Sequence, residues 1–136
     1  MRKQYYFRPS ERGLLAWDVD RLIVLTTHLP RVDIPLTAIR ELDEAYWHGD
    51  DDTLLTWRTV LEHARLIEAA DLIFPIILSS DGRVMDGMHR IAKTILQGRT
   101  TIEAVQFTCD PEPDYVGVPP SELPYEEVCD DPTKLS

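Results

Sequence analysis

The stretch DGRVMDGMHR, residues 81–90, places two Asp-Gly steps five residues apart. The first step, Asp81 and Gly82, follows the apolar run FPIILSS and is typical of a tight hairpin turn. The short run RVMD would then return as the second strand. A helix is expected over residues 88–97, and Gly98 would end it. This short stretch and its flanks therefore predict a strand, a turn, a second strand and a helix, in that order.

Three cations follow the second Asp-Gly step. His89, Arg90 and Lys93 lie within the first turn and a half of the expected helix. A helix N-terminus already carries about half a positive charge, so each cation there is unfavourable by about 0.3–1 kcal/mol. A bound anion would resolve this conflict, because free backbone N–H groups and cationic side chains together hold phosphate. The pattern therefore predicts a phosphate site, in which Gly87 lets the ligand approach the backbone closely.

The same residues also have an ordinary structural interpretation. In the functional one, Asp86 would cap the helix, orient His89 or meet a phosphate-bound metal. In the structural one, Asp86 is only a cap, Arg90 and Lys93 are solvated, and His89 bonds to a backbone carbonyl. The buried side of the helix would consist of Met88, Ile91, Ala92, Ile95 and Leu96. The residues alone leave both interpretations open.

Strands and helices are mixed along the chain without a regular βαβ rhythm, which predicts a small α+β fold, a mixed sheet with packed helices. Extended segments are expected at RLIVLTT (21–27), VDIPL (32–36), FPIILSS (74–80), RVMD (83–86) and TIEAVQF (101–107). Two further helices are expected at TAIRELDEAYWHG (37–49) and TLLTWRTVLEHARLIEAA (53–70). Thr37 would cap the first of these and Gly49 would end it.

Residues 109–136 differ in composition from the rest. They hold eight acidic residues against one lysine, and six of the ten prolines lie between Pro111 and Pro132. Such a segment is extended or loop-like rather than part of a core. We therefore expect one α+β domain over residues 1–108 and an acidic, proline-rich extension over residues 109–136.

Charge and cysteine usage narrow the range of partners. The net charge is −10 and no broad basic face is evident, so DNA is not expected as a partner. Neither a membrane-spanning apolar run nor a secretory signal is present, which favours a cytoplasmic protein without membrane contact. Cys109 and Cys129 lack the spacing of a metal site. HGDDD (48–52) is more typical of a helix end and the next cap than of a cation site, so no protein-held metal centre is predicted.

The segment FPIILSSDGRVMDGMHRIAKTILQG (74–98) resembles the core of the ParB/sulfiredoxin-like superfamily. The shared pattern is a "PI" strand, a turn, a strand ending in Asp-Gly, and a His-Arg pair that opens a helix. Here these are Pro75 and Ile76, Asp81 and Gly82, Asp86 and Gly87, and His89 and Arg90. The resemblance extends over about residues 31–107 if IPLTAIREL is the usual lead-in strand and helix.

The resemblance implies a compact α+β fold that binds a nucleotide diphosphate or triphosphate at this helix start. Sulfiredoxins place a reactive cysteine where this chain has Met88, so sulfiredoxin activity is not expected. ParB-type partition proteins carry GERR at the matching place and a helix-turn-helix region, where this chain has an acidic tail. Free-serine kinases of the same fold carry Asp-Gly-x-His-Arg, which DGMHR matches best. Their further carboxylate base has candidates here in Glu41, Asp43 and Glu44, although a solvated helix face is the simpler interpretation.

These arguments predict a domain that binds a nucleotide, with Mg²⁺, or another phosphorylated small molecule. Gly87, Met88 and the following amides would cradle phosphate, and Arg90 and Lys93 would neutralise it. His89 and Asp86 would be the catalytic residues of a small kinase or nucleotide hydrolase. The alternative is a non-catalytic interaction or regulatory module in which DGMHR is structural, and a homodimer or another protein partner stays open.

Overall fold

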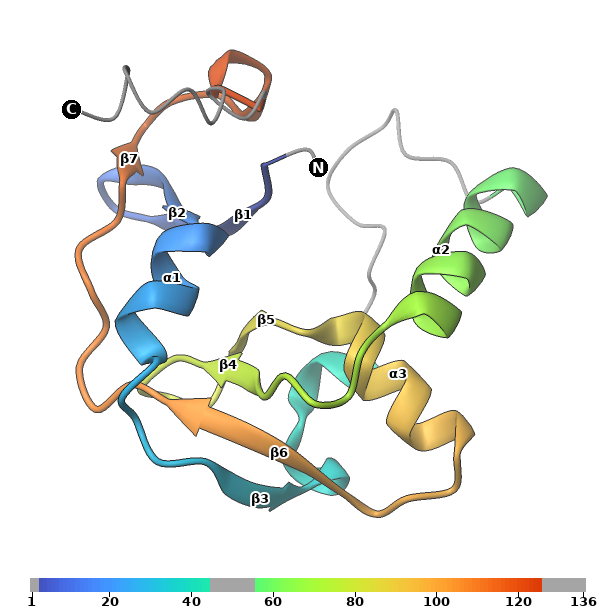
Figure 1. The fold of residues 1–136 in the computed structure, drawn as a ribbon. Helices are drawn as coiled ribbons and strands as arrows, with labels where there is room; N and C mark the ends of the chain where they lie inside the picture. Colours follow the sequence, from blue (N-terminus) through green and yellow to red (C-terminus); the bar gives the residue numbers. More distant parts are fainter. Residues whose placement is uncertain (1–2, 45–55, 126–136) are drawn as a thin grey trace, which may run out of the picture. The chain divides into compact units, whose positions relative to one another are not determined.

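The computed structural model describes residues 3–44 and 56–125 (Figure 1). The chain divides into two compact units: a central unit, His28–Cys109, and a terminal unit, Met1–Thr27 with Asp110–Ser136. The expected boundary at residue 109 falls beside one of these divisions, but the first 27 residues group with the residues that follow it. Both units contain helices and strands, so the α+β class is confirmed.

The central unit is built around a four-stranded mixed sheet in the order β3-β6-β4-β5. Strands β4 and β6 are parallel, and the other pairs are antiparallel. Helix α3 connects β5 to β6 and contacts both central strands, while α2 contacts α3 (Figure 1). The strands are β3 Val32–Pro35, β4 Ile76–Leu78, β5 Val84–Asp86 and β6 Thr101–Gln106, and the helices are α2 Trp57–Ala69 and α3 Met88–Leu96.

The core of the central unit lies between this sheet and the short elements that cover it. Its buried members are all apolar and come from β4, β5, β6, α3 and the segment after β3. They are Leu36, Ile39, Ile76, Leu78, Val84, Ile91, Ile102 and Ala104, with Ile34 and Met88 packed against them. Burial of these side chains fixes how α3 rests on the sheet, and therefore where its first turn lies.

The hairpin and the helix expected from the two Asp-Gly steps are confirmed. Gly82 has φ 86° in the turn between β4 and β5, and its N–H donates to the Ser79 carbonyl. Gly98 follows α3 with φ 77°. The expected inner face of α3 is only partly right, because Ile95 and Leu96 are exposed. Thr94 is buried instead, since its hydroxyl donates to the Arg90 carbonyl and needs no water.

The helix expected at residues 37–49 is wrong over its described part. Two 3-10 turns, η1 Leu36–Ala38 and η2 Arg40–Asp43, flank Ile39, which is extended at φ −90° and ψ 104°. Leu36 and Ile39 are both buried in the core, and their spacing of three suits a 3-10 turn. Thr37 caps neither turn, and the expected stop at Gly49 lies outside the described residues.

The terminal unit was not anticipated as an element of structure. Strands β1 Tyr5–Ser10 and β2 Gly13–Asp18 form an antiparallel hairpin, and β7 Tyr115–Val116 pairs with β2 from the other side. Helix α1, Val19–Thr26, follows β2, and a 3-10 turn η3, Pro120–Glu122, follows β7. Part of the acidic extension is therefore a strand in a sheet with the N-terminal hairpin.

The strand expected at RLIVLTT is wrong, because these residues belong to α1. Asp18 caps this helix by accepting from the Asp20 N–H. Val19, Leu22 and Thr26 then fall on its one buried face, at helical spacing. The cap and the face lie partly before the β-rich run, so a window limited to that run misses them.

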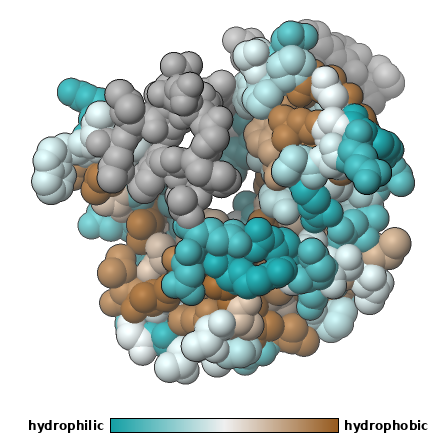
Figure 2. Space-filling view, turned by 180° about the vertical axis from the view of Figure 1, so that it is seen from behind, coloured by the Kyte–Doolittle hydropathy of each residue, from teal (hydrophilic) through white to brown (hydrophobic). Residues whose placement is uncertain are grey.

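Helix α2 is amphipathic but contains no fully buried residue. Thr56 caps it, and Trp57, Leu61 and Leu66 are exposed, Trp57 by 82%. Apolar patches also reach the surface between polar ones in the space-filling view (Figure 2). Within the described ranges, no helix has the length and apolar character needed to cross a membrane.

Candidate functional site

The candidate site is the first turn of α3, where β5 ends. Gly87 is the N-cap with φ 118°, and no side chain caps the helix. The first turn contains no acidic residue. The cap predicted for Asp86 is therefore absent, and the first backbone N–H groups of α3 donate to no capping side chain.

Gly87 is required by its own conformation and by its neighbour. A Cβ atom there would lie 2.5 Å from Cγ2 and 2.9 Å from Cβ of Ile76. Such distances are shorter than atoms of these types allow, and φ 118° is itself unfavourable for other residues. The close approach that the sequence suggested for a ligand is thus made by β4.

Arg90 ties the start of α3 to the sheet. Its Nη2 donates to Oδ2 of Asp86 at 2.7 Å, and its Nη1 donates to the Pro75 carbonyl at 3.1 Å. Both charged side chains are more than four-fifths buried. The predicted role of Asp86 in orienting His89 is replaced by this ion pair with Arg90, and Arg90 is itself held in place before any ligand binds.

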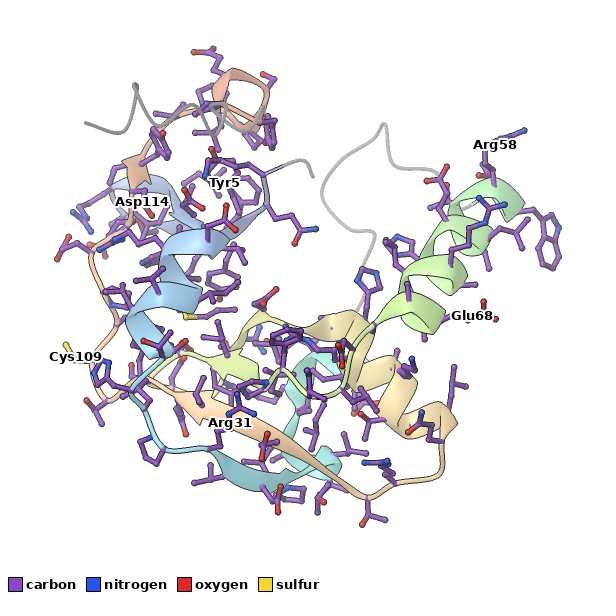
Figure 3. The ribbon with its side chains drawn as sticks, in the orientation of Figure 1. Tyr5, Arg31, Arg58, Glu68, Cys109 and Asp114 are labelled. Atoms are coloured by element: carbon purple, nitrogen blue, oxygen red, sulfur yellow. The ribbon has the colours of Figure 1, made fainter. Side chains whose placement is uncertain are left out.

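Lys93 serves the neighbouring helix. Its Nζ donates to the carbonyls of Glu68 and Ala70, each at 2.8 Å, at the C-terminal end of α2, where Figure 3 labels Glu68. A cation at that end satisfies unpaired carbonyls and the negative end of the helix dipole. A phosphate at the start of α3 would have to compete with these bonds for Lys93.

His89 contacts a second histidine that sequence reasoning did not bring to the site. Nδ1 of His63, on α2, lies 3.0 Å from Nε2 of His89, and the two rings stack with centroids 5.3 Å apart. Burial, then the nearby His63, lower the pKa of His89 below its ordinary value of about 6.5, while Asp86 opposes the shift. His89 is therefore neutral near pH 7 and can donate or accept a proton.

No signal in the sequence pairs these histidines. They are 26 positions apart on different helices, and the stripe pattern of α2 places His63 only near its edge. The pairing depends on how α2 packs against α3, which is a tertiary feature.

Met88 points to the core rather than to a ligand. It is half-buried and packs against the apolar cluster of the central unit. Its backbone N–H is still part of the first turn, so only its amide fits the predicted phosphate role.

In the parts of the chain that the structure covers, no three His, Cys, Asp or Glu side chains gather as metal ligands do. Cys109 is exposed, and Cys129 and the HGDDD run lie outside the described residues. No family model, curated protein or solved structure matches this chain.

Proposed function

We propose that this chain binds a phosphate-bearing small molecule, a nucleotide with Mg²⁺, at the start of α3. The observation that carries the proposal is the first turn of α3, which has neither a side-chain cap nor an acidic residue. Its backbone N–H groups and the helix dipole favour an anion there.

The roles of the side chains follow from their contacts. The amides of Met88 and His89 would donate to phosphate oxygens. Arg90 would contribute its remaining N–H groups while its bonds to Asp86 and Pro75 keep it rigid. Lys93 has no role at the phosphate in this proposal, because its Nζ donates to carbonyls at the end of α2.

Asp86 and the phosphate oxygens would together hold Mg²⁺. Oδ2 of Asp86 is bonded to Arg90, whereas Oδ1 has no hydrogen bond within the described residues. One carboxylate together with phosphate oxygens and water is a common way for proteins to hold Mg²⁺. The ion would neutralise charge on the phosphates.

Turnover, if the site supports it, would depend on the histidine pair. A neutral His89 could take the proton of an attacking water or hydroxyl group, and the phosphorus–oxygen bond to the leaving nucleotide would break. His63, 3.0 Å away, could share the proton. This assigns the chain to small kinases or nucleotide hydrolases, with a ParB/sulfiredoxin-like fold and a cytoplasmic location as parts of the same proposal.

The test is thermal unfolding with a panel of nucleotides, with and without Mg²⁺. A ligand at a hundred times its Kd stabilises the folded chain by about 2.7 kcal/mol. For a chain of this size, that raises the melting temperature by several degrees. We expect turnover to be lost in His89→Gln, which keeps the backbone amide, and to persist in His28→Gln, an exposed histidine of the same unit. Arg90→Ala is a poor probe, because it removes the bonds to Asp86 and Pro75 as well. A lack of any shift with every nucleotide would reject the proposal.

The second candidate is an interaction or regulatory module in which DGMHR is structural. Gly87, Arg90 and Lys93 each have a structural partner in the fold, which favours this alternative. A second copy or another protein would then be the partner. This candidate predicts that nucleotides leave both the melting temperature and the association state unchanged.

A further inference from the structure

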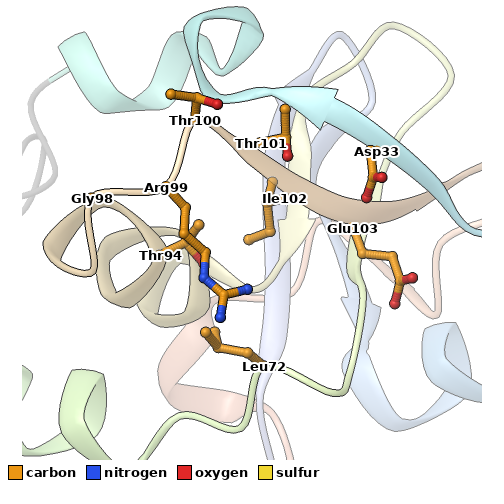
Figure 4. Close-up of a pocket in the computed structure, with 9 residues that line it drawn as sticks. All are labelled: Asp33, Leu72, Thr94, Gly98, Arg99, Thr100, Thr101, Ile102 and Glu103. Carbon is orange, nitrogen blue, oxygen red and sulfur yellow. The ribbon is translucent and has the colours of Figure 1, made fainter.

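A separate cavity opens at the other end of α3. It has a volume of about 590 Å³ and lies within the central unit, between the end of α3, the start of β6, and β3 (Figure 4). Helix α3 has nine residues and is about 13 Å long, so this cavity and the first turn of α3 are different places. A volume of this size suits a small molecule.

Arg99 supplies positive charge to one side of the cavity. Its guanidinium reaches past Thr94 toward Leu72 in the close-up (Figure 4). Among the described residues, no hydrogen bond or ion pair engages this side chain. A guanidinium in this state recognises a carboxylate, which it binds through two parallel hydrogen bonds.

Asp33 and Glu103 supply negative charge to another side. They are register partners on β3 and β6, so their side chains lie next to each other on one face of the sheet. Arg31 donates to Oε1 of Glu103 at 3.0 Å, but within the described ranges no cation pairs with Asp33. Two like charges directly across a strand pair are destabilising, and an ammonium group between them would remove that cost.

From this arrangement we infer that the cavity binds a zwitterionic small molecule whose carboxylate and ammonium groups are separated by a short chain. Arg99 binds the carboxylate, and Asp33 with Glu103 binds the ammonium group. Leu72 is an apolar side chain of the lining that would contact the spacer, and Thr101 lines the cavity as well. This inference does not depend on the phosphate site.

The geometry favours a spacer of several bonds. Thr101 and Glu103 point to the same face of β6 and are about 7 Å apart along the strand, and Arg99 lies before both. An α-amino acid carries both charges on one carbon and spans too little. We therefore take ω-aminohexanoate as the reference ligand of the series.

The experiment is an NMR titration of the isotope-labelled full chain with ω-amino acids of increasing length, from glycine to ω-aminooctanoate. Hexanoate and hexylamine, which each lack one charge, are the matched ligand controls. We expect the tightest binding at an intermediate length, with shifts at the amides of Asp33 and residues 99–103. Weaker binding of either control is expected at the same concentration.

Variants decide which side chains are responsible. Arg99→Gln should weaken ω-aminohexanoate binding by about tenfold or more, and Arg99→Glu should shift the preference to hexanediamine. Arg58→Gln is the control, because Arg58 is an exposed residue at the start of α2 and does not line the cavity (Figure 3). No binding of the series at about 10 mM, equal binding of hexanoate, or unchanged binding by Arg99→Gln would overturn the inference.

Discussion

The contacts within each of the two units join residues at very different separations in the sequence. In the central unit, a turn, two strands and a helix follow one another directly between Ile76 and Leu96. In the terminal unit, the side-chain bonds that attach the C-terminal segment to the first 27 residues include contacts between residues 91 to 102 positions apart. The first kind of structure forms from neighbours, whereas the second requires the closure of a long loop.

The terminal unit is stabilised by specific contacts between residues that are far apart in the sequence. The Trp17 indole N–H donates to the Pro111 carbonyl at 2.8 Å, and Arg8 bonds to Asp110 at 3.0 Å. The Arg8 guanidinium also lies over the rings of Tyr6 and Trp17, 5.5 and 5.0 Å from their centroids. Trp17 and Arg8 thus both join the hairpin to the C-terminal segment.

The largest effect is therefore expected from Trp17→Ala. Trp17 is 1% exposed, and its removal leaves a cavity and an unpaired Pro111 carbonyl. The free energy of unfolding should fall by about 3–5 kcal/mol. Chemical denaturation would measure this, and hydrogen exchange should show lost protection at the N–H groups of Asp114 and Gly117, which bond to β2.

Trp57→Ala is the matched control, since it removes the same side chain from an exposed position on α2. Its effect should stay within about 0.5 kcal/mol. Equal losses in the two variants would contradict the assignment of Trp17 as a contact that joins the hairpin of the terminal unit to its C-terminal segment.

The next largest effect tests the local construction of the central unit. Gly87→Ala should lower the free energy of unfolding by about 2–4 kcal/mol, because it combines φ 118° with a clash against Ile76. Gly82→Ala has a comparable φ of 86° but meets no atom within 4 Å, and should cost about 1 kcal/mol. Denaturation curves of the two variants separate backbone strain from steric contact, and equal losses would show that the contact with Ile76 contributes nothing.

This contrast explains what the sequence could predict. Asp81 with Gly82, the strand before them and Gly98 act through local backbone preferences, and the structure confirms the elements expected from them. The β-rich residues of α1 predict a strand when they are taken without the Asp18 cap that precedes them. Strand β7 has only two residues and its pairing with β2 is nonlocal, so no local pattern could indicate it.

The candidate site shows the same limit at the level of side chains. The sequence located Asp86, His89 and Arg90 at a helix start, and the structure places them there. It could not show that Asp86 pairs with Arg90, that Lys93 reaches α2, or that His63 meets His89. The first of these contacts depends on side-chain rotamers, and the other two depend on the packing of α2 against α3.

A moderate effect is expected from Lys93→Met. The variant removes two hydrogen bonds to the carbonyls of Glu68 and Ala70 but keeps most of the apolar stem. Stability should fall by about 1–2 kcal/mol, with faster hydrogen exchange concentrated in α2. Arg65→Met, at an exposed position of α2, should change little. Uniform loss of protection throughout the central unit would show that Lys93 does more than hold the end of α2.

The smallest effect is the one that bears most directly on the site, and it concerns pH. Because the pKa of His89 is lowered in the folded chain, the unfolded chain binds its proton more readily. The free energy of unfolding should therefore rise with pH from the lowered pKa up to about 6.5, and this contribution should be constant above it. His63 and Asp86 are the two neighbours that act on His89, in opposite directions.

Denaturation at several pH values would measure this slope. His89→Gln should flatten it, whereas His28→Gln should keep it, because His28 is exposed. An unchanged slope in His89→Gln would mean that the contact with His63 does not control protonation, and the role of His89 as a proton acceptor would then lose its physical basis. A flattened slope would instead show that the packing of α2 against α3 tunes a histidine beside the open helix start, so that a long-range contact acts on the locally encoded site.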